Sequence, residues 1–144
     1  MKLGFYSELA RRNIVKASDF IAGHGYKATP GDIRRLRQDM MKLDESAGFL
    51  PVLGLPDFFS TSACRDMLFH VQEHRMTLGF IGAFLSENKL QFFGFDIGAH
   101  VLQAYRRRFP DDRAATNLGR WEIFENENPD TFLGMYQFWI QKVD

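Results

Sequence analysis

The chain has 144 residues, of which 45% are hydrophobic and 25% charged, with 18 Lys and Arg against 18 Asp and Glu. This length predicts one domain, residues 1–144, with an ordinary core. The zero net charge gives no electrostatic reason to expect DNA, RNA or an anionic membrane as a partner. The single cysteine, Cys64, excludes an intrachain disulfide, and the lack of a signal peptide or an apolar run of spanning length predicts a cytoplasmic protein.

The first half of the chain shows one strand pattern followed by helical patterns. Residues 2–7, "KLGFYS", are aromatic and apolar and predict a short strand. Residues 8–23 carry apolar side chains at helical spacing and end in glycine, which indicates a helix. Thr29 followed by Pro30 is typical of the start of a second helix, because threonine caps a helix and proline fits its first turn. Residues 46–60 hold two prolines and two glycines, and we expect a loop attached to the core by its aromatic side chains.

The second half also predicts mainly helices. One is expected from Thr61 to His74 and another after the cap residue Thr77. The run "LQFFGFDI", residues 90–97, is almost continuously apolar and predicts a strand that is buried on both faces. Further helices are expected after this strand, and the last of them, beginning at Asn128 and Pro129, is expected to bury Phe132, Met135, Tyr136, Trp139, Ile140 and Val143. The whole pattern predicts an α+β fold, mostly helical, with about two short strands.

Residues 70–74 read "HVQEH", which matches the H-x-x-E-H pattern of inverted zincins. In that pattern the equivalents of His70 and His74 hold zinc from one helix face, and the equivalent of Glu73 activates water. A catalytic zinc site needs a third protein ligand, and the sequence does not select one of the glutamates within residues 122–127. The alternative is that these side chains lie on the solvated side of a helix. We therefore expect no metal site, and a zinc hydrolase is a remote alternative.

A longer and more specific string lies near the C-terminal end of the chain. Residues 121–139 read W-x-x-F-E-x-x-x-P-x-T-F-x-x-M-Y-Q-F-W, and they follow "DFFSTSACRDMLFHVQEHRMTLGFIGAFLSENKLQFFGFDI" and "YRRRFPDD". These segments resemble the C-terminal part of a group of bacterial class I S-adenosylmethionine-dependent methyltransferases, in which tetratricopeptide repeats often precede the catalytic domain. The start, "MKLGFYSELARRNIV", is similar to the segment after the "PGG" turn of those enzymes, so the resemblance covers essentially the whole chain.

The resemblance implies that residues 2–7 are the fifth strand of a methyltransferase sheet, and that residues 77–97 are the next helix and the sixth strand. Residues 26–76 would then be a helical cap inserted on the substrate side. A class I methyltransferase holds S-adenosylmethionine with a glycine-rich turn after its first strand, and the sequence contains no strand–GxGxG–helix unit. We therefore expect the first four strands to be missing, no cofactor-binding residues in this chain, and no activity of the chain alone.

The resemblance also implies where a substrate would bind, because ligands of open α/β sheets lie beyond the carboxyl ends of the strands. The catalytic residues and the methyl acceptor are not identified. The alternative for each candidate is structural, with the histidines paired on the surface and Tyr6 in the core. The candidate substrate contacts are Tyr6, Ser7 and Glu8 at the end of the first strand, and His70, Glu73, His74 and Arg75 in the cap.

A competing interpretation is a non-catalytic helical interaction module, whose aromatic faces dock onto another chain or onto a second copy. The chain contains 15 Phe, 2 Trp and 4 Tyr, and so many large rings need a core or an interface to cover them. A sheet that lacks strands also exposes an edge, and edges recruit partners. We therefore expect the partner to be either a second copy in a homodimer or the missing N-terminal methyltransferase half.

Overall fold

The computed structural model describes residues 1–70, 73–132 and 135–144. The chain forms two compact units, of which unit 1 comprises Met1–Arg11 and His74–Asp144, and unit 2 comprises Arg12–Glu73. The described residues hold six α-helices, three short 3-10 helices and a four-stranded mixed sheet, so the fold is α+β and mostly helical, as predicted. None of the helices in these ranges has the length and apolar character needed to cross a bilayer.

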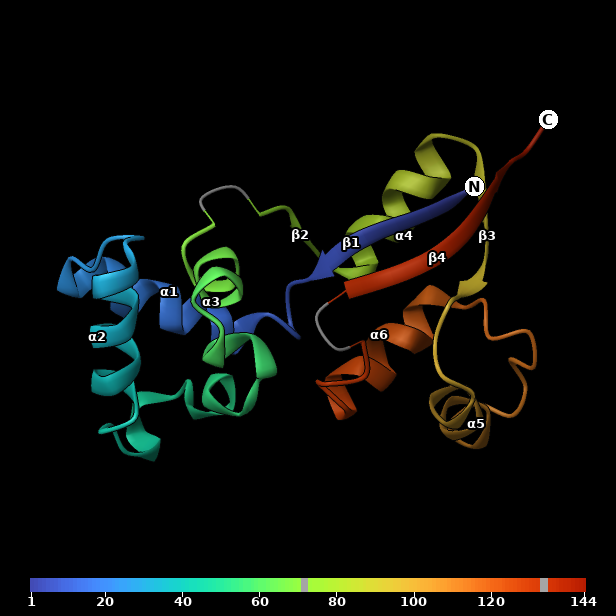
Figure 1. The fold of residues 1–144 in the computed structure, drawn as a ribbon. Coiled ribbons are helices and arrows are strands. Elements are labelled where there is room, and N and C mark those ends of the chain that lie inside the picture. Colours follow the sequence, from blue (N-terminus) through green and yellow to red (C-terminus); the bar gives the residue numbers. More distant parts are fainter. Residues whose placement is uncertain (71–72, 133–134) are drawn as a thin grey trace. The chain divides into compact units, whose positions relative to one another are not determined.

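The sheet lies in unit 1 and has the strand order β2-β1-β4-β3 (Figure 1). β1 and β2 run parallel, whereas β4 runs antiparallel to both β1 and β3. The strands predicted at residues 2–7 and 90–97 are confirmed as β1 and β3. The expected burial of the second strand on both faces is wrong, because Phe93 is 51% exposed. The prediction of about two strands is wrong, because the sheet has four. Their bounds are Lys2–Ser7 for β1, Arg75–Met76 for β2, Leu90–Phe95 for β3 and Met135–Lys142 for β4.

β4 is a strand where the sequence predicted the last helix. Its side chains alternate, so that Tyr136, Phe138 and Ile140 are buried while Met135 and Trp139 are exposed. Trp139 is 50% exposed, Val143 48% and Met135 36%, so the predicted burial of these three side chains is wrong. A strand forms here because β4 gives hydrogen-bond partners to β1 and β3 at once, and without it neither would have a partner along most of its length.

Three helices complete unit 1: α4 (Leu78–Glu87), α5 (Ala99–Arg108) and α6 (Leu118–Glu127). The predicted cap of α4 is confirmed, since the Thr77 hydroxyl oxygen accepts a hydrogen bond of 3.2 Å from the backbone N–H of Phe80. Residues of these helices share one core with the inward side chains of β4. This core contains Leu78, Ile81, Leu85, Tyr105, Ala115, Trp121, Phe124, Phe132, Tyr136, Phe138 and Ile140. On the other face of the sheet, which we call the uncovered face, Phe93, Met135 and Trp139 are exposed.

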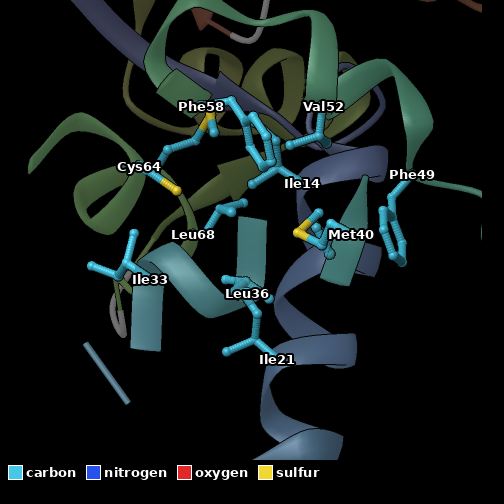
Figure 2. Packing of buried hydrophobic residues seen from close by; sticks show 12 residues of the cluster. Ile14, Ile21, Ile33, Leu36, Met40, Phe49, Val52, Phe58, Cys64 and Leu68 are labelled. Carbon is cyan, nitrogen blue, oxygen red and sulfur yellow. The ribbon is translucent and has the colours of Figure 1, made fainter. Parts of the chain in front are cut away.

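Unit 2 consists of α1 (Arg12–His24), α2 (Pro30–Met40), three 3-10 helices (Glu45–Ala47, Leu50–Gly54 and Pro56–Phe59) and α3 (Thr61–Leu68). The predicted start of α2 is confirmed, because Thr29 caps it and Pro30 occupies its first turn. The segment 46–60 is attached to the core by its apolar side chains, as predicted. Figure 2 shows that core, in which Phe49, Val52 and Phe58 from this segment pack with residues of α1, α2 and α3.

α3 is shorter than predicted, because it ends at Leu68 and not at His74. Its buried side chains include Cys64, Met67 and Leu68. The hydroxyl of Ser18 donates a hydrogen bond of 3.0 Å to the carbonyl oxygen of Leu68, and this contact satisfies a carbonyl that the helix itself leaves unpaired. Val71 continues the helical spacing of Cys64, Met67 and Leu68 in the sequence, and it lies outside the described residues.

Candidate site at the carboxyl end of strand β1

The carboxyl end of β1 is held in place by the short strand β2. Tyr6 pairs with Arg75 and Ser7 with Met76, and the backbone N–H of Glu8 donates a hydrogen bond of 3.0 Å to the carbonyl of Met76. The structure therefore brings Tyr6, Ser7, Glu8 and Arg75 together at one end of the sheet. Of these, Glu8 and Arg75 are exposed, Tyr6 is half-buried and Ser7 is buried.

Ser7 belongs to a buried polar cluster that joins three elements of the fold. Its hydroxyl donates a hydrogen bond of 2.5 Å to Oε1 of Glu125 in α6, and Oε2 of the same carboxyl accepts a bond of 2.7 Å from the Tyr136 hydroxyl in β4. The Ser7 oxygen also accepts a bond of 3.1 Å from the backbone N–H of Ala10. The turn after β1 is thus fixed to α6 and β4 through one carboxyl group.

Glu125 is 3% exposed, and this burial raises the pKa of its carboxyl group. The hydrogen bonds from Ser7 and Tyr136 act in the opposite direction, while the nearby carboxylate of Glu122 raises the pKa further. Burial likewise raises the pKa of the Tyr136 hydroxyl. No cation is among the groups that shift Glu125, so two neutral hydroxyls carry the stabilisation of its charge.

Two kinds of group lie at this end of the sheet: a buried polar cluster and exposed charged side chains. Glu125, Ser7 and Tyr136 are sealed from solvent, and together they can hold or release one proton without touching a ligand. Glu8 and Arg75 present opposite charges at the surface beside them, and the guanidinium of Arg11 lies 4.6 Å from the centre of the Tyr6 ring. The exposed groups can bind a polar ligand, whereas the buried cluster fixes the backbone that carries them.

The remaining candidates from the sequence do not form a helical zinc pattern. His70 and Glu73 belong to unit 2 and His74 to unit 1, and all three lie beyond the end of α3 at Leu68. The zinc hypothesis assumed that His70 and His74 share one face of a helix, and this premise is wrong because neither residue is in a helix. Within the described residues, no three His, Cys, Asp or Glu side chains are grouped so that they could hold a metal ion.

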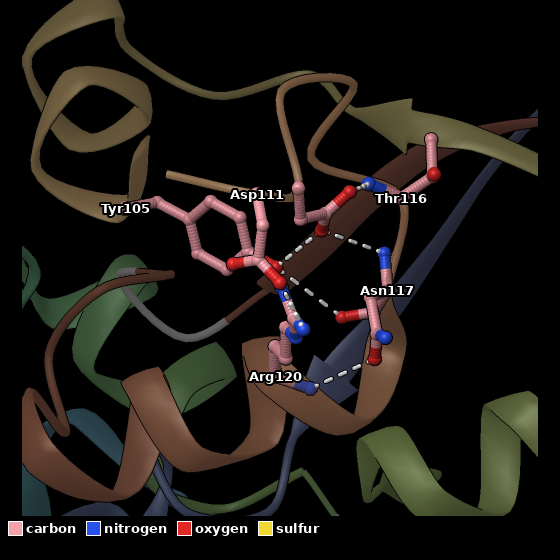
Figure 3. Close-up of polar contacts among 6 residues, drawn as sticks. Tyr105, Asp111, Thr116, Asn117 and Arg120 are labelled. Atoms are coloured by element: carbon pink, nitrogen blue, oxygen red, sulfur yellow. Dashed lines mark hydrogen bonds and ion pairs between the residues drawn. The ribbon is translucent and has the colours of Figure 1, made fainter. Parts of the chain in front are cut away.

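A second polar cluster braces the connection between α5 and α6 (Figure 3). The Tyr105 hydroxyl donates a hydrogen bond of 2.6 Å to Oδ2 of Asp112, which also accepts a bond of 3.0 Å from the backbone N–H of Asn117. Burial acts to raise the pKa of Asp112, but these hydrogen bonds outweigh it and hold the pKa below its usual value. The Tyr105 ring stacks on Trp121 at 3.8 Å, so we assign a structural role to this cluster.

Glu125 and Tyr136 were not among the site residues predicted from the sequence. A signal for Glu125 was present, because it follows Phe124 and lies four residues after Trp121, on the apolar side of α6. An acidic residue at such a position needs hydrogen-bond donors from elsewhere in the fold. Tyr136 gave no such signal, since its expected place was a helix face.

No protein-family model matches the sequence, and none of the curated proteins matches it either. What the fold and the site define is a two-unit α+β protein, with a sealed carboxyl–hydroxyl cluster and exposed charges at the carboxyl end of one strand.

Proposed function

We propose that the chain is the C-terminal, substrate-side portion of an S-adenosylmethionine-dependent methyltransferase. In this proposal a separate N-terminal half binds the cofactor, and the chain alone is inactive. The candidate contacts to the methyl acceptor remain Tyr6, Glu8, His70, Glu73, His74 and Arg75. Ser7, which was also a candidate, is buried and holds Glu125. A cytoplasmic location is part of the same proposal.

The observation that carries this proposal is the direction of the strands. β1 and β3 are each antiparallel to β4, and therefore run in the same direction as one another. The resemblance assigns them as the fifth and sixth strands of one sheet, and successive parallel strands are joined by a crossover that is usually an α-helix. α4 lies in that crossover, directly before β3. β4 lies between these two strands and runs antiparallel to both, so β1 and β3 are parallel but not adjacent.

The division of the chain supports the proposed cap. Unit 2, Arg12–Glu73, is inserted between β1 and α4 and has its own core, where the resemblance implied a helical insertion at residues 26–76. An insertion at this point follows the carboxyl end of a strand, which is the end where open α/β sheets bind their ligands.

The free edge of β1 supports the proposed partner. β2 pairs only with Tyr6 and Ser7, and in the described part of the chain no other strand lies on that side of β1. In a doubly wound sheet with strand order 3-2-1-4-5-6, the fourth strand lies beside the fifth. A cofactor-binding half that ends in such a strand would fill the edge from Lys2 to Phe5.

The test is the DNA sequence that precedes the Met1 codon in the source genome. We expect an upstream reading frame that encodes a "PGG" turn and a glycine-rich strand–turn–helix unit. The joined chain should bind S-adenosylmethionine in calorimetry with a dissociation constant on the order of micromolar, which corresponds to about −8 kcal/mol. An upstream region without that unit, or a joined chain that does not bind the cofactor, would contradict the proposal.

A non-catalytic interaction module is the second candidate, and the uncovered face of the sheet favours it. Phe93 and Trp139 are about half exposed there, at 51% and 50%, and apolar patches of this kind mark interaction sites. A thermal-shift measurement of the joined chain separates the two candidates, because a methyltransferase is stabilised by S-adenosylmethionine and an interaction module is not.

A further inference from the structure

β3 forms an edge of the four-stranded sheet. In the residues that the structure describes, β4 pairs with one side of β3 and no strand pairs with the other side. An edge strand presents a row of unpaired N–H and C=O groups, which is a template for a strand from another chain. The question is which strand would fit this edge.

The backbone of β3 fixes which of its groups point outward. The carbonyl of Lys89 accepts a hydrogen bond of 2.9 Å from the N–H of Val143, and the N–H of Asp96 donates one of 2.8 Å to Gln137, so both ends of the strand point toward β4. Pairing groups alternate in direction along an antiparallel strand, and therefore those of Leu90 and Phe95 point away from β4. Leu90 and Phe95 are an odd number of positions apart, so in a regular strand their groups would point in opposite directions. The extra residue between Phe92 and Gly94 shifts the alternation by one, and the groups of both residues therefore point the same way.

We propose that the free edge of β3 pairs antiparallel with β3 of a second copy of this chain, about a twofold axis between Phe92 and Phe93. In this register the outward groups of Leu90 face those of Phe95 of the partner subunit. A bulge usually discourages edge pairing. Here the extra residue allows the outward backbone groups of Leu90 and Phe95 to pair across the twofold axis, once on each side of it. The contact is isologous and closes as a dimer.

The charges at the two ends of β3 complement each other in this register. Lys89 is exposed and falls opposite Asp96 of the partner subunit, and the same pair recurs on the other side of the axis. The Asp96 side chain is 53% exposed, and its Oδ2 contacts Lys2 Nζ at 2.5 Å, which leaves Oδ1 as an acceptor. A parallel arrangement would instead place like charges side by side, which is unfavourable across strands.

The uncovered face of the sheet adds an apolar contact at the axis. Phe93 and Trp139 line an open hollow together with Met1, Leu90 and neighbouring residues of β4. Phe93 lies beside the proposed axis, so the Phe93 rings of the two copies would meet and cover part of this surface. Aromatic side chains with few charges around them are typical of the centre of an interface.

The dimer can be tested by sedimentation velocity at micromolar concentration, with variants in which the charges of Lys89 and Asp96 are reversed. Wild type should sediment as a dimer, and Lys89→Asp and Asp96→Lys should each weaken association about tenfold. The double variant Lys89→Asp/Asp96→Lys should restore it. Phe93→Asp should also weaken the dimer, whereas Phe80→Asp, at an equally exposed phenylalanine on α4, should not.

A monomeric wild type, or a dimer that the double variant does not restore, would overturn the proposal. Circular dichroism of each variant separates a lost dimer from a lost fold. A second measurement needs no variant: carbodiimide joins adjacent amines and carboxylates, and a mixture of unlabelled and ¹⁵N-labelled chains shows which cross-links are intermolecular. We expect a mixed-isotope link between Lys89 and Asp96, and its absence would equally refute the pairing. These tests do not depend on the proposed methyl transfer.

Discussion

Replacing Glu125 with Gln should remove a pH dependence from the stability of unit 1. Burial raises the pKa of Glu125 in the folded chain above its unfolded value of about 4.3. A raised pKa means that the folded chain holds this proton more tightly than the unfolded chain does. The stabilisation is therefore fully present below the unfolded pKa, and it is lost as the pH rises through the folded pKa. Glutamine has no proton to lose.

The size of the effect follows from the loss of one proton. Between the unfolded and the folded pKa of Glu125, each pH unit lowers the free energy of unfolding of wild type by at most about 1.4 kcal/mol relative to Glu125→Gln. The amide keeps both contacts, since its oxygen can accept from one hydroxyl and its nitrogen can donate to the other. For domains of about 60 to 250 residues, 1 kcal/mol shifts the melting temperature by roughly 2–8 °C.

The assay is tryptophan fluorescence during thermal unfolding, because both tryptophans of the chain, Trp121 and Trp139, lie in unit 1. The melting temperature of Glu125→Gln minus that of wild type should be larger at pH about 8 than at pH about 5. Any constant cost of the amide cancels in this comparison.

Glu127→Gln is the matched control, two residues further along α6. The hydrogen bond from Arg108 lowers the pKa of Glu127, so its stabilisation is present above the unfolded pKa and is lost as the pH falls. The control difference should therefore change in the opposite direction, at lower pH. If the Glu125→Gln difference is the same at both pH values, or larger in acid, the reasoning about the buried carboxyl is refuted.

Three further outcomes are expected. Tyr105→Phe keeps the ring on Trp121 but removes the 2.6 Å hydrogen bond to Asp112. The free energy of unfolding, followed by tryptophan fluorescence, should therefore fall by about 1–3 kcal/mol. An unchanged midpoint would argue against the brace between α5 and α6. The purified chain should retain no stoichiometric zinc, and metal analysis after dialysis that finds about one zinc per chain, lost in His70→Ala, would contradict this. Calorimetry of the chain alone should detect no S-adenosylmethionine binding, and a dissociation constant near micromolar would show that it holds a cofactor site of its own.

Local signals in the sequence predicted the parts of the fold that depend on local chemistry. Thr29 and Thr77 each accept a hydrogen bond from the backbone three residues later, and both were recognised as helix caps. The strands at residues 2–7 and 90–97 were recognised from short aromatic runs. The carboxyl end of β1, where the sequence led us to expect a site, carries Ser7 and its buried partners.

The end of α3 could not be predicted because its cause is distant in the sequence. Residues 61–74 contain neither glycine nor proline, and the helical pattern therefore seemed to continue. In the structure, Ser18 from α1 bonds the carbonyl of Leu68 and takes the place of a further turn. The shorter helix removes the face that His70 and His74 were expected to share.

The residues of β4 were predicted as a helix, and this incorrect assignment left two features of the structure unpredicted. Its apolar residues fit both a helical spacing and an alternation, and only the pairing with β1 and β3 decides between them. Alternation turns Tyr136 inward, where its hydroxyl reaches Glu125, and turns Trp139 outward beside Phe93. A helix would have placed Tyr136 and Trp139 on the same side and buried both. The strand therefore contributes Tyr136 to the buried carboxyl cluster and Trp139 to the exposed aromatic surface beside Phe93, so one strand links the group tested by pH to the surface beside the proposed dimer axis.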